Sequence, residues 1–232
     1  MNGSAALELH GVARRFSQRW ALRGIDLDAS AGQVVALTGR NGSGKTTLLR
    51  ICSTLLRPTR GGGRLFGQDI VGDADALRGR IGFLAHETGL YDNLTATENL
   101  GFALRMAGLT ADATAIRNAL VEVGLGHEHH ERVRGFSSGM RRRVALARLL
   151  LRPPDLLLLD EPYASFDVEG IERVNAFASS VAAAGGIVLV ATHDLRRAEP
   201  ILHREARLEN GRVVEERGHL DPALATLPEG EI

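Results

Sequence analysis

Residues 39–46 of this 232-residue chain read Gly39-Arg40-Asn41-Gly42-Ser43-Gly44-Lys45-Thr46 and match the pattern G-x-x-x-x-G-K-[ST] at every fixed position. A continuous apolar run at 34–38 comes directly before them and predicts a strand that is buried on both faces. A helical pattern follows over 45–56, and Pro58 is expected to end it. The order of strand, glycine-rich turn and helix predicts a loop that binds the phosphates of a nucleoside triphosphate.

Each part of this motif has its own task in binding phosphate. The glycines allow the backbone to curl so that successive N–H groups point at phosphate oxygens, and the helix N-terminus adds positive potential. Lys45 supplies a full charge, and the Thr46 hydroxyl is a predicted ligand of Mg²⁺. We therefore expect residues 39–46 and Thr47 to bind ATP, with ATP and Mg²⁺ as the cofactors.

Two carboxylates follow a second buried strand. Four leucines at 156–159 precede Asp160 and Glu161, which places both acids at the carboxyl edge of the predicted sheet, where α/β proteins bind ligands. We expect Asp160 to hold Mg²⁺ and Glu161 to orient or deprotonate the water that attacks the γ-phosphate. Two acids after a strand would also suit a helix cap, so this prediction depends on the phosphate loop upstream.

Hydrophobic patterns divide the rest of the chain into a core and a helical insert. Short strands are expected at 7–12 and 21–27, and the glycines at 61–63 are expected to form a flexible turn. The stretch 94–151 is helical in pattern throughout. A helix at 168–184 and a strand at 187–191 then restore the alternation that a parallel sheet requires. A hairpin around Asn210 and Gly211 and a loosely held tail at 221–232 end the chain.

Charge and cysteine content exclude several classes of protein. Lys and Arg total 28, as do Asp and Glu, so no overall field would attract nucleic acid, and no nucleic-acid partner is expected. The single cysteine, Cys52, excludes an internal disulfide and is expected to be a small core residue; the absence of a secretory leader at 1–10 favours the cytoplasm. The longest apolar stretches are shorter than the roughly 18 to 20 residues that span a bilayer, so we expect no pore from this chain alone.

Residues 136–140 read Phe136-Ser137-Ser138-Gly139-Met140 and resemble the signature LSGGQ of the ABC ATPases, which opens a helix. Ser137 and Gly139 match the family pattern, whereas Phe136, Ser138 and Met140 depart from it. A serine hydroxyl and exposed N–H groups at a helix N-terminus still make an anion site. In ABC ATPases this site faces the γ-phosphate held by the opposite subunit. The resemblance therefore implies that Ser137, Ser138, Gly139 and Met140 bind ATP in trans.

Further residues occur in the order of the ABC family. Phe16 resembles the aromatic residue that stacks on adenine, with Trp20 as the alternative. Asp167 closes a segment that looks like the D-loop, which implies a contact with ATP in trans, and His193 resembles the catalytic switch histidine. Alone, Phe16 would suit a core position and His193 the surface. The ordered set favours the functional interpretation.

His86 occupies the Q-loop position, where most ABC ATPases have a glutamine that meets Mg²⁺ or water and links to the membrane subunit. A histidine can form similar hydrogen bonds when it is neutral, and unlike glutamine it can become cationic. The resemblance therefore implies a catalytic and Mg²⁺-binding role for His86.

The resemblance covers 7–218 and implies an α/β fold. This is the P-loop NTPase fold of ABC ATPases, with a RecA-like, mainly parallel sheet core, an antiparallel β subdomain and an inserted helical subdomain. Within one nucleotide-binding domain, 1–232, we expect a catalytic core at 1–90 and 152–220, a helical signature subdomain at 91–151 and a tail at 221–232. The resemblance also implies a homodimer that forms on ATP binding, transmembrane permease subunits as partners, and a peripheral position at the cytoplasmic face of the inner (plasma) membrane.

Three segments, 86–90, 94–100 and 136–140, look like the haem-exporter ATPases of cytochrome c maturation, the CcmA family. Similar sequence motifs occur in ABC-2-type exporters of drugs, polysaccharides and lipids, which remain the alternative. Nothing in the chain is a haem site. His127, His129 and His130 stand beside acidic residues and are interpreted as a solvated loop rather than a metal or haem ligand set.

Other classes share only part of these features. A P-loop kinase or GTPase would need a substrate lid or a guanine-reading motif, and neither is visible. An ABC protein acting on ribosomes or DNA is expected to have two cassettes or a long coiled coil, whereas this chain has one cassette and no sustained heptads. A binding module without activity is disfavoured because Lys45, Asp160 and Glu161 are all present. The resemblance therefore implies an ABC-type ATPase that couples hydrolysis to transport.

Overall fold

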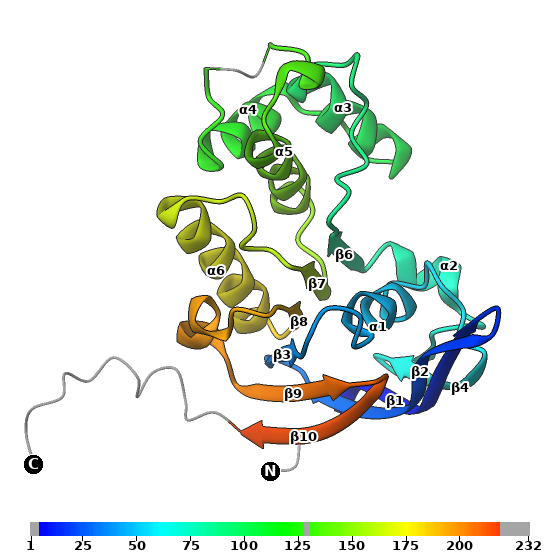
Figure 1. Ribbon diagram of the computed structural model, residues 1–232. Helices are drawn as coiled ribbons and strands as arrows, with labels where there is room; N and C mark the ends of the chain where they lie inside the picture. The colour runs from blue at the N-terminus through cyan, green and yellow to red at the C-terminus, as the bar shows by residue number, and fades with distance from the viewer. Residues whose placement is uncertain (1–4, 128–129, 219–232) are drawn as a thin grey trace, which may run out of the picture.

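A computed structural model describes residues 5–127 and 130–218, which form two β-sheets with helices packed around them (Figure 1). The predicted tail at 221–232 and His129 lie outside the described residues. None of the described helices combines the length and the hydrophobicity that crossing a bilayer requires.

The central sheet has strand order β10-β9-β3-β8-β7-β6. Its strands are β3 (Val34–Thr38), β6 (Ile81–Leu84), β7 (Leu156–Asp160), β8 (Ile187–Ala191), β9 (Arg204–Glu209) and β10 (Arg212–Gly218). Neighbours from β9 to β6 pair in parallel, and β10 pairs with β9 as an antiparallel hairpin. The mainly parallel core and the hairpin around Asn210 are therefore confirmed.

Strands β3, β7 and β8 are buried along their whole length. Successive side chains of a strand point to opposite faces of the sheet, so Val34 and Ala36 enter one hydrophobic core while Val35 and Leu37 enter the other. This is why the sequence has continuous apolar runs here rather than alternating ones. The prediction of strands covered on both faces is confirmed.

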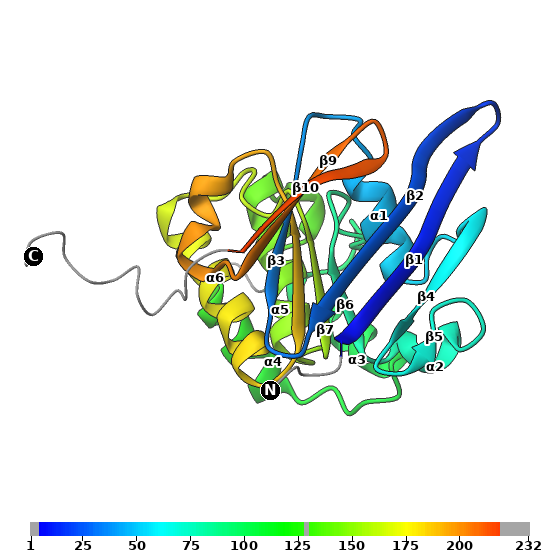
Figure 2. The ribbon, with the colours of Figure 1, turned by 90° about the horizontal axis from the view of Figure 1, so that it is seen from below.

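A second, antiparallel sheet has the order β2-β1-β4-β5. Its strands are β1 (Ala5–Phe16), β2 (Arg19–Ser30), β4 (Arg60–Leu65) and β5 (Gln68–Asp69), and the short helix α2 (Ala74–Arg78) follows. Helix α1 (Lys45–Cys52) packs between the two sheets, and its apolar side chains share one core with β1, β2 and β3 (Figure 2). Cys52 is fully buried in this core, as predicted, and burial raises the pKa of its thiol to about 12.

Two local predictions are wrong. The glycines at 61–63 belong to β4, where Gly63 pairs with Leu9 and Gly62 with His10 of β1, and a Cβ on Gly63 would lie 2.2 Å from the Glu8 carbonyl oxygen. These glycines therefore permit a close approach of strands rather than a flexible turn. Helix α1 ends at Cys52 rather than near Pro58, because Thr54 adopts φ +61°, which the α-helix does not allow.

Helices α3 (Ala96–Met106), α4 (Ala113–Glu122) and α5 (Ser138–Leu150) lie together on the side of the central sheet away from β1 and β2 (Figure 1). Helix α3 begins at a capping box in which Thr95 and Glu98 bond each other's main chain. Helix α6 (Val168–Ala183) packs against β8 and β3. The apolar faces of α3 to α6 form the second core, on the opposite face of the sheet from α1.

Candidate active site

The loop 39–46 joins β3 to α1 at the carboxyl edge of the central sheet. Gly39, Gly42 and Gly44 all have φ between +80° and +134°, which side chains with a Cβ rarely adopt. A Cβ on Gly39 would lie 2.2 Å from the Leu208 carbonyl oxygen, so the loop also passes too close to β9 for any other residue. These constraints curl the backbone tightly, as a phosphate site requires.

Two polar side chains of this loop are buried and suited to an anion. Lys45 is 6% exposed, and its Nζ donates to the Gly39 carbonyl oxygen at 2.7 Å. The Ser43 hydroxyl is buried and makes no hydrogen bond to any described residue. A buried hydroxyl without a partner is unfavourable unless a ligand bonds it. The loop therefore fits the phosphate groups of a nucleotide.

Asp160 ends β7 opposite the first turn of α1 and is 4% exposed. The Thr46 hydroxyl donates to Asp160 Oδ1 at 3.0 Å, so the two predicted Mg²⁺ ligands lie side by side. Burial raises the pKa of Asp160, while the Thr46 bond opposes this rise. A hydroxyl and a carboxylate are oxygen donors of the kind that Mg²⁺ prefers, so the residues present fit this ion.

Glu161 directly follows Asp160, and its backbone turns sharply away from β7. Its φ is +47°, and its N–H donates to the Ala191 carbonyl oxygen at 2.8 Å. One carboxylate oxygen lies 2.8 Å from His193 Nδ1, and the other lies 3.8 Å from Lys45 Nζ. The structure thus brings three predicted catalytic side chains, Lys45, Glu161 and His193, into one connected group.

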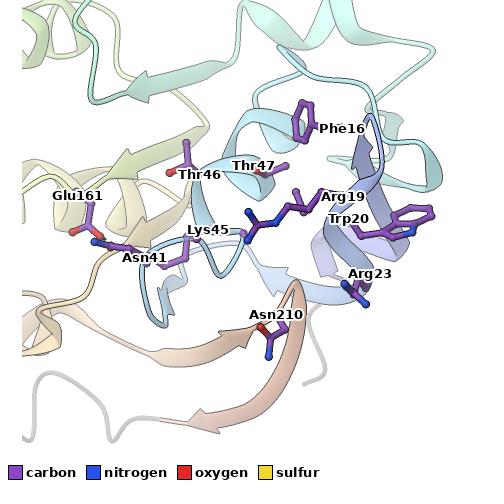
Figure 3. Close-up of a pocket in the computed structure, with 13 residues that line it drawn as sticks. Phe16, Arg19, Trp20, Arg23, Asn41, Lys45, Thr46, Thr47, Glu161 and Asn210 are labelled. Carbon is purple, nitrogen blue, oxygen red and sulfur yellow. Dashed lines mark ion pairs between the residues drawn. The ribbon is translucent and has the colours of Figure 1, made fainter.

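A cavity of about 450 Å³ opens beside this group (Figure 3). Its lining comes from β1, β2, the phosphate loop, α1, Glu161 and the β9–β10 turn: Phe16, Arg19, Trp20, Ala21, Arg23, Asn41, Gly42, Gly44, Lys45, Thr46, Thr47, Glu161 and Asn210. Arg40 lies outside this cavity and lines an adjoining one with Ser43. Sequence reasoning missed Arg19, Arg23 and Asn210, because no motif places these three residues near the phosphate loop.

Both aromatic candidates for adenine line this cavity. Phe16 ends β1 with 47% of its surface exposed, and the Arg14 guanidinium stacks 4.7 Å from its ring centre. The Trp20 ring points away from the phosphate loop in Figure 3 and stacks against Arg15 and Arg60. Phe16 is therefore the better placed of the two for stacking on a base above Thr47.

The residues expected to act in trans form a separate cavity of about 260 Å³, which includes Ser137, Gly139, Met140 and Asp167. Ser137 caps α5 by accepting a hydrogen bond from the Met140 N–H. Ser138 is the exposed first residue of this helix. The phosphate-loop cavity and this one share no lining residue. One chain therefore does not bring its two candidate ATP-binding surfaces together.

Asp167 is held beside this second cavity by two contacts. Its carboxylate accepts from the Gly170 N–H at the start of α6 and from Arg143 Nη2, the latter through both oxygens at 2.9 Å. These bonds, the Gly170 bond first, lower the pKa of Asp167. Arg143 belongs to α5, so the signature helix and the start of α6 are joined directly.

His86 does not line the phosphate-loop cavity. It is exposed after β6, and its Nδ1 lies 3.2 Å from Nη2 of Arg142. Among the described residues, no three or more His, Cys, Asp or Glu side chains are grouped so that they could hold a metal ion. His127 and His130 are described residues and belong to no such group.

Comparison with known families assigns a class to this arrangement. A family model described as ABC transporter matches residues 22–164. The daunorubicin/doxorubicin resistance ATP-binding protein DrrA of Streptomyces peucetius is 35% identical over 225 residues, which are 95% of this chain and 68% of that protein. The cytochrome c biogenesis ATP-binding export protein CcmA 2 of Cupriavidus metallidurans is 39% identical over 196 residues, which are 84% of this chain and 92% of that protein.

A solved structure has the same fold. A dimeric ATP-binding cassette in a post-hydrolysis state, bound to ADP and Pi, superposes with a TM-score of 0.84 at 26% identity, over 91% of this chain and 98% of that chain. The ligands of that cassette are the products of ATP hydrolysis.

Replacement of Lys45 tests the phosphate site. Lys45→Ala removes the buried positive charge of the loop, so turnover of ATP should fall by about 100-fold or more. Binding of a fluorescent ATP analogue should weaken, while circular dichroism should show an unchanged fold. Arg78→Ala, which removes an exposed arginine paired with Asp75, is the control and should leave turnover unchanged. A folded Lys45→Ala protein with near-normal activity would refute the assignment.

Replacement of Asp160 separates stability from activity. Burial raises the pKa of Asp160, so ionisation of this carboxyl is less favourable in the folded state than in the unfolded state. Its contribution to the free energy of unfolding therefore falls as pH rises through its folded pKa. Asp160→Asn should therefore raise the unfolding temperature at pH 7 without nucleotide. The gain should vanish as pH falls below the usual aspartate range.

The same variant should lose Mg²⁺-dependent ATP hydrolysis by about 100-fold, since an amide is a poor substitute for the carboxylate ligand. Asp75→Asn, which replaces a carboxyl that is 91% exposed, is the stability control and should change neither property. Equal or lower thermal stability of Asp160→Asn at pH 7 would contradict the burial argument.

Proposed function

Because this chain belongs to the ABC transporter family as an ATP-binding subunit that hydrolyses ATP, we propose that two copies of it enclose two ATP molecules and thereby drive transmembrane permease subunits. The observation that carries this proposal is the separation of the two candidate ATP surfaces within one chain. The signature surface of a second copy can meet the phosphate loop of the first copy. This arrangement is supported by the dimeric cassette to which the chain is similar.

The phosphate loop binds the β- and γ-phosphates through its N–H groups, Ser43 and Lys45. Thr46 and Asp160 hold Mg²⁺, which neutralises charge on the phosphates when it is bound. Glu161 orients the attacking water and accepts its proton, and His193, 2.8 Å away, holds the Glu161 carboxylate in place. Most of the catalysis then comes from positioning and charge stabilisation.

The second copy completes the site. The N–H groups at the start of α5, with Ser137, Ser138, Gly139 and Met140, face the γ-phosphate across the dimer, and Asp167 lies beside them. Phe16 stacks on the adenine ring. ATP binding closes the dimer, hydrolysis opens it, and His86 acts from the Q-loop position next to the membrane subunit. The chain works as a peripheral protein at the cytoplasmic face of the inner membrane.

We propose haem export and cytochrome c biogenesis as the process that this ATPase powers. The support is the resemblance of 86–90, 94–100 and 136–140 to that family, together with 38 to 40% identity to the CcmA proteins. The second candidate is an exporter of drugs, polysaccharides or lipids. It is favoured by the DrrA proteins, which are 35 to 37% identical and match up to 95% of this chain.

The dimer is tested with Glu161→Gln. This change keeps the size of the side chain and the binding of Mg²⁺ and ATP but removes the carboxylate that activates water, so a closed dimer should accumulate. Sedimentation velocity with ATP and Mg²⁺ should show dimers for the variant and monomers for the wild type after turnover.

A second substitution locates the dimer interface. Gly139→Glu is unsuitable, because a Cβ there would lie 2.6 Å from the Ser165 carbonyl oxygen of the same chain. Ser138→Glu is better, since this exposed first helical position accepts an acidic residue. Added to Glu161→Gln, it should prevent dimerisation by repelling the opposing γ-phosphate. A Glu161→Gln protein that binds ATP yet stays monomeric with and without its membrane partner would sink the proposal.

Gene deletion distinguishes the two transport processes. Loss of this gene should abolish haem-stained c-type cytochromes in membranes, and the wild-type gene but not Glu161→Gln should restore them. Sensitivity to anthracyclines, the second readout, should stay unchanged. Normal levels of c-type cytochromes together with raised drug sensitivity would contradict haem export and support the drug exporter as the function.

A further inference from the structure

Arg142 is a buried arginine that no part of the proposed cycle uses. It is the middle one of three successive arginines on α5 and is 3% exposed. Its neighbours Arg141 and Arg143 form ion pairs with Asp92 and Asp167. Within the part of the chain that the structure describes, no carboxylate lies within ion-pair distance of Arg142, although the charges of Asp160 and Glu161 act on it from farther away. A buried cation of this kind requires other partners.

Those partners are main-chain carbonyls of the turn after β7. Arg142 Nη1 donates to the Glu161 carbonyl oxygen at 2.6 Å and to the Ala164 carbonyl oxygen at 3.1 Å. Its Nη2 lies 3.2 Å from His86 Nδ1. Since an arginine can only donate, His86 accepts this bond and carries its proton on Nε2. One guanidinium therefore joins α5, the catalytic turn and the segment after β6.

The turn that Arg142 holds has an unfavourable backbone. Glu161 has φ +47° and Ser165 has φ +69°, and residues with a Cβ adopt such values only where their surroundings impose them. The two carbonyls bonded by Arg142 lie at Glu161 and within the same turn at Ala164. Charge-assisted hydrogen bonds from a buried guanidinium are strong, so they stabilise this conformation of the turn.

The conformation of Glu161 decides where its carboxylate points. With φ at +47°, the two carboxylate oxygens reach His193 and Lys45, at 2.8 Å and 3.8 Å. Relaxation of φ to a negative value would redirect the Cα–Cβ bond and separate these groups. A shift of this kind disrupts the alignment of a general base with its water.

We propose that Arg142 is a positioning residue for ATP hydrolysis, which holds the Glu161 main chain so that its carboxylate faces the phosphate site. This inference rests on the role of Glu161 proposed above. Ser137 and Arg142 belong to the same rigid start of α5. A displacement of the ATP-contacting end of this helix therefore moves the donor that holds Glu161, which links engagement of the second copy to the readiness of the catalytic carboxylate.

Kinetics of Arg142 variants of the full chain test this role. Arg142→Met fills the space without donating, and Arg142→Lys can reach one carbonyl but not all three acceptors. We expect kcat to fall by about 10- to 100-fold in Arg142→Met, as for a small misplacement of a catalytic group, with Arg142→Lys intermediate. KM and the affinity for a fluorescent ATP analogue should change by less than about threefold, because no phosphate contact is lost.

The matched control is Arg141→Gln, which removes the adjacent arginine and its surface pair with Asp92. It should leave kcat within about twofold of the wild type, as expected for an exposed ion pair. Equal losses in Arg141→Gln and Arg142→Met would mean that any damage to α5 lowers activity, and this would overturn the proposal.

A double-mutant cycle decides whether Arg142 acts through Glu161. In the Glu161→Gln background, Arg142→Met should cause little further loss of single-turnover hydrolysis, because the group that it positions is already absent. Multiplicative losses would assign Arg142 a purely structural role and overturn the proposal, as would unfolding of both Arg142 variants by circular dichroism. Full activity of Glu161→Gln alone would instead overturn the role of Glu161, which distinguishes the two failures.

Discussion

The close approach of the phosphate loop to the strands around it is the constraint on which the rest of the site depends. Cβ atoms at Gly39 and Gly44 would lie 2.2 Å from the Leu208 carbonyl oxygen and 2.6 Å from Leu22, so both positions require glycine. The Gly211 N–H donates to the Ser43 carbonyl oxygen, and the Gly211 carbonyl accepts from Arg23. Sheet, hairpin and loop therefore hold one another in this conformation.

Parallel strands then supply the remaining groups at the same edge. The carboxyl ends of β3, β7 and β8 are adjacent, so Lys45, Glu161 and His193 meet although they are far apart in sequence. Lys45 and Asp160 are only 6% and 4% exposed, and the lower local dielectric constant that goes with such burial strengthens interactions with phosphate. The same burial disfavours the Asp160 carboxylate and raises its pKa. The position of this predicted Mg²⁺ ligand at the end of a buried strand therefore makes its ionisation less favourable in the folded state than in the unfolded state.

The sequence could predict what depends on local pattern. The apolar runs at 34–38, 156–159 and 187–191 predicted the buried strands, and the ABC ATPase fold is confirmed by the comparisons. Local sequence pattern gave wrong predictions where contacts with distant segments determine the conformation. The glycines at 61–63 serve contact with β1, and α1 ends early at a left-handed Thr54. Asn210 and Arg142 reach the site only through tertiary packing, so no spacing in the sequence could identify them.

Arg142 and Arg143 connect the signature helix to the segment that runs from Glu161 to Asp167. Arg143 bonds Asp167 at the start of α6, and Arg142 bonds the turn that begins at Glu161. The segment between these two acids is therefore attached at both ends to α5. Such a segment cannot move independently of the helix without breaking charge-assisted bonds, one of them buried. In the dimer proposed above, the helix that contacts the ATP of the second copy would also hold the Glu161 turn of its own chain, so the two ATP sites would depend on each other mechanically.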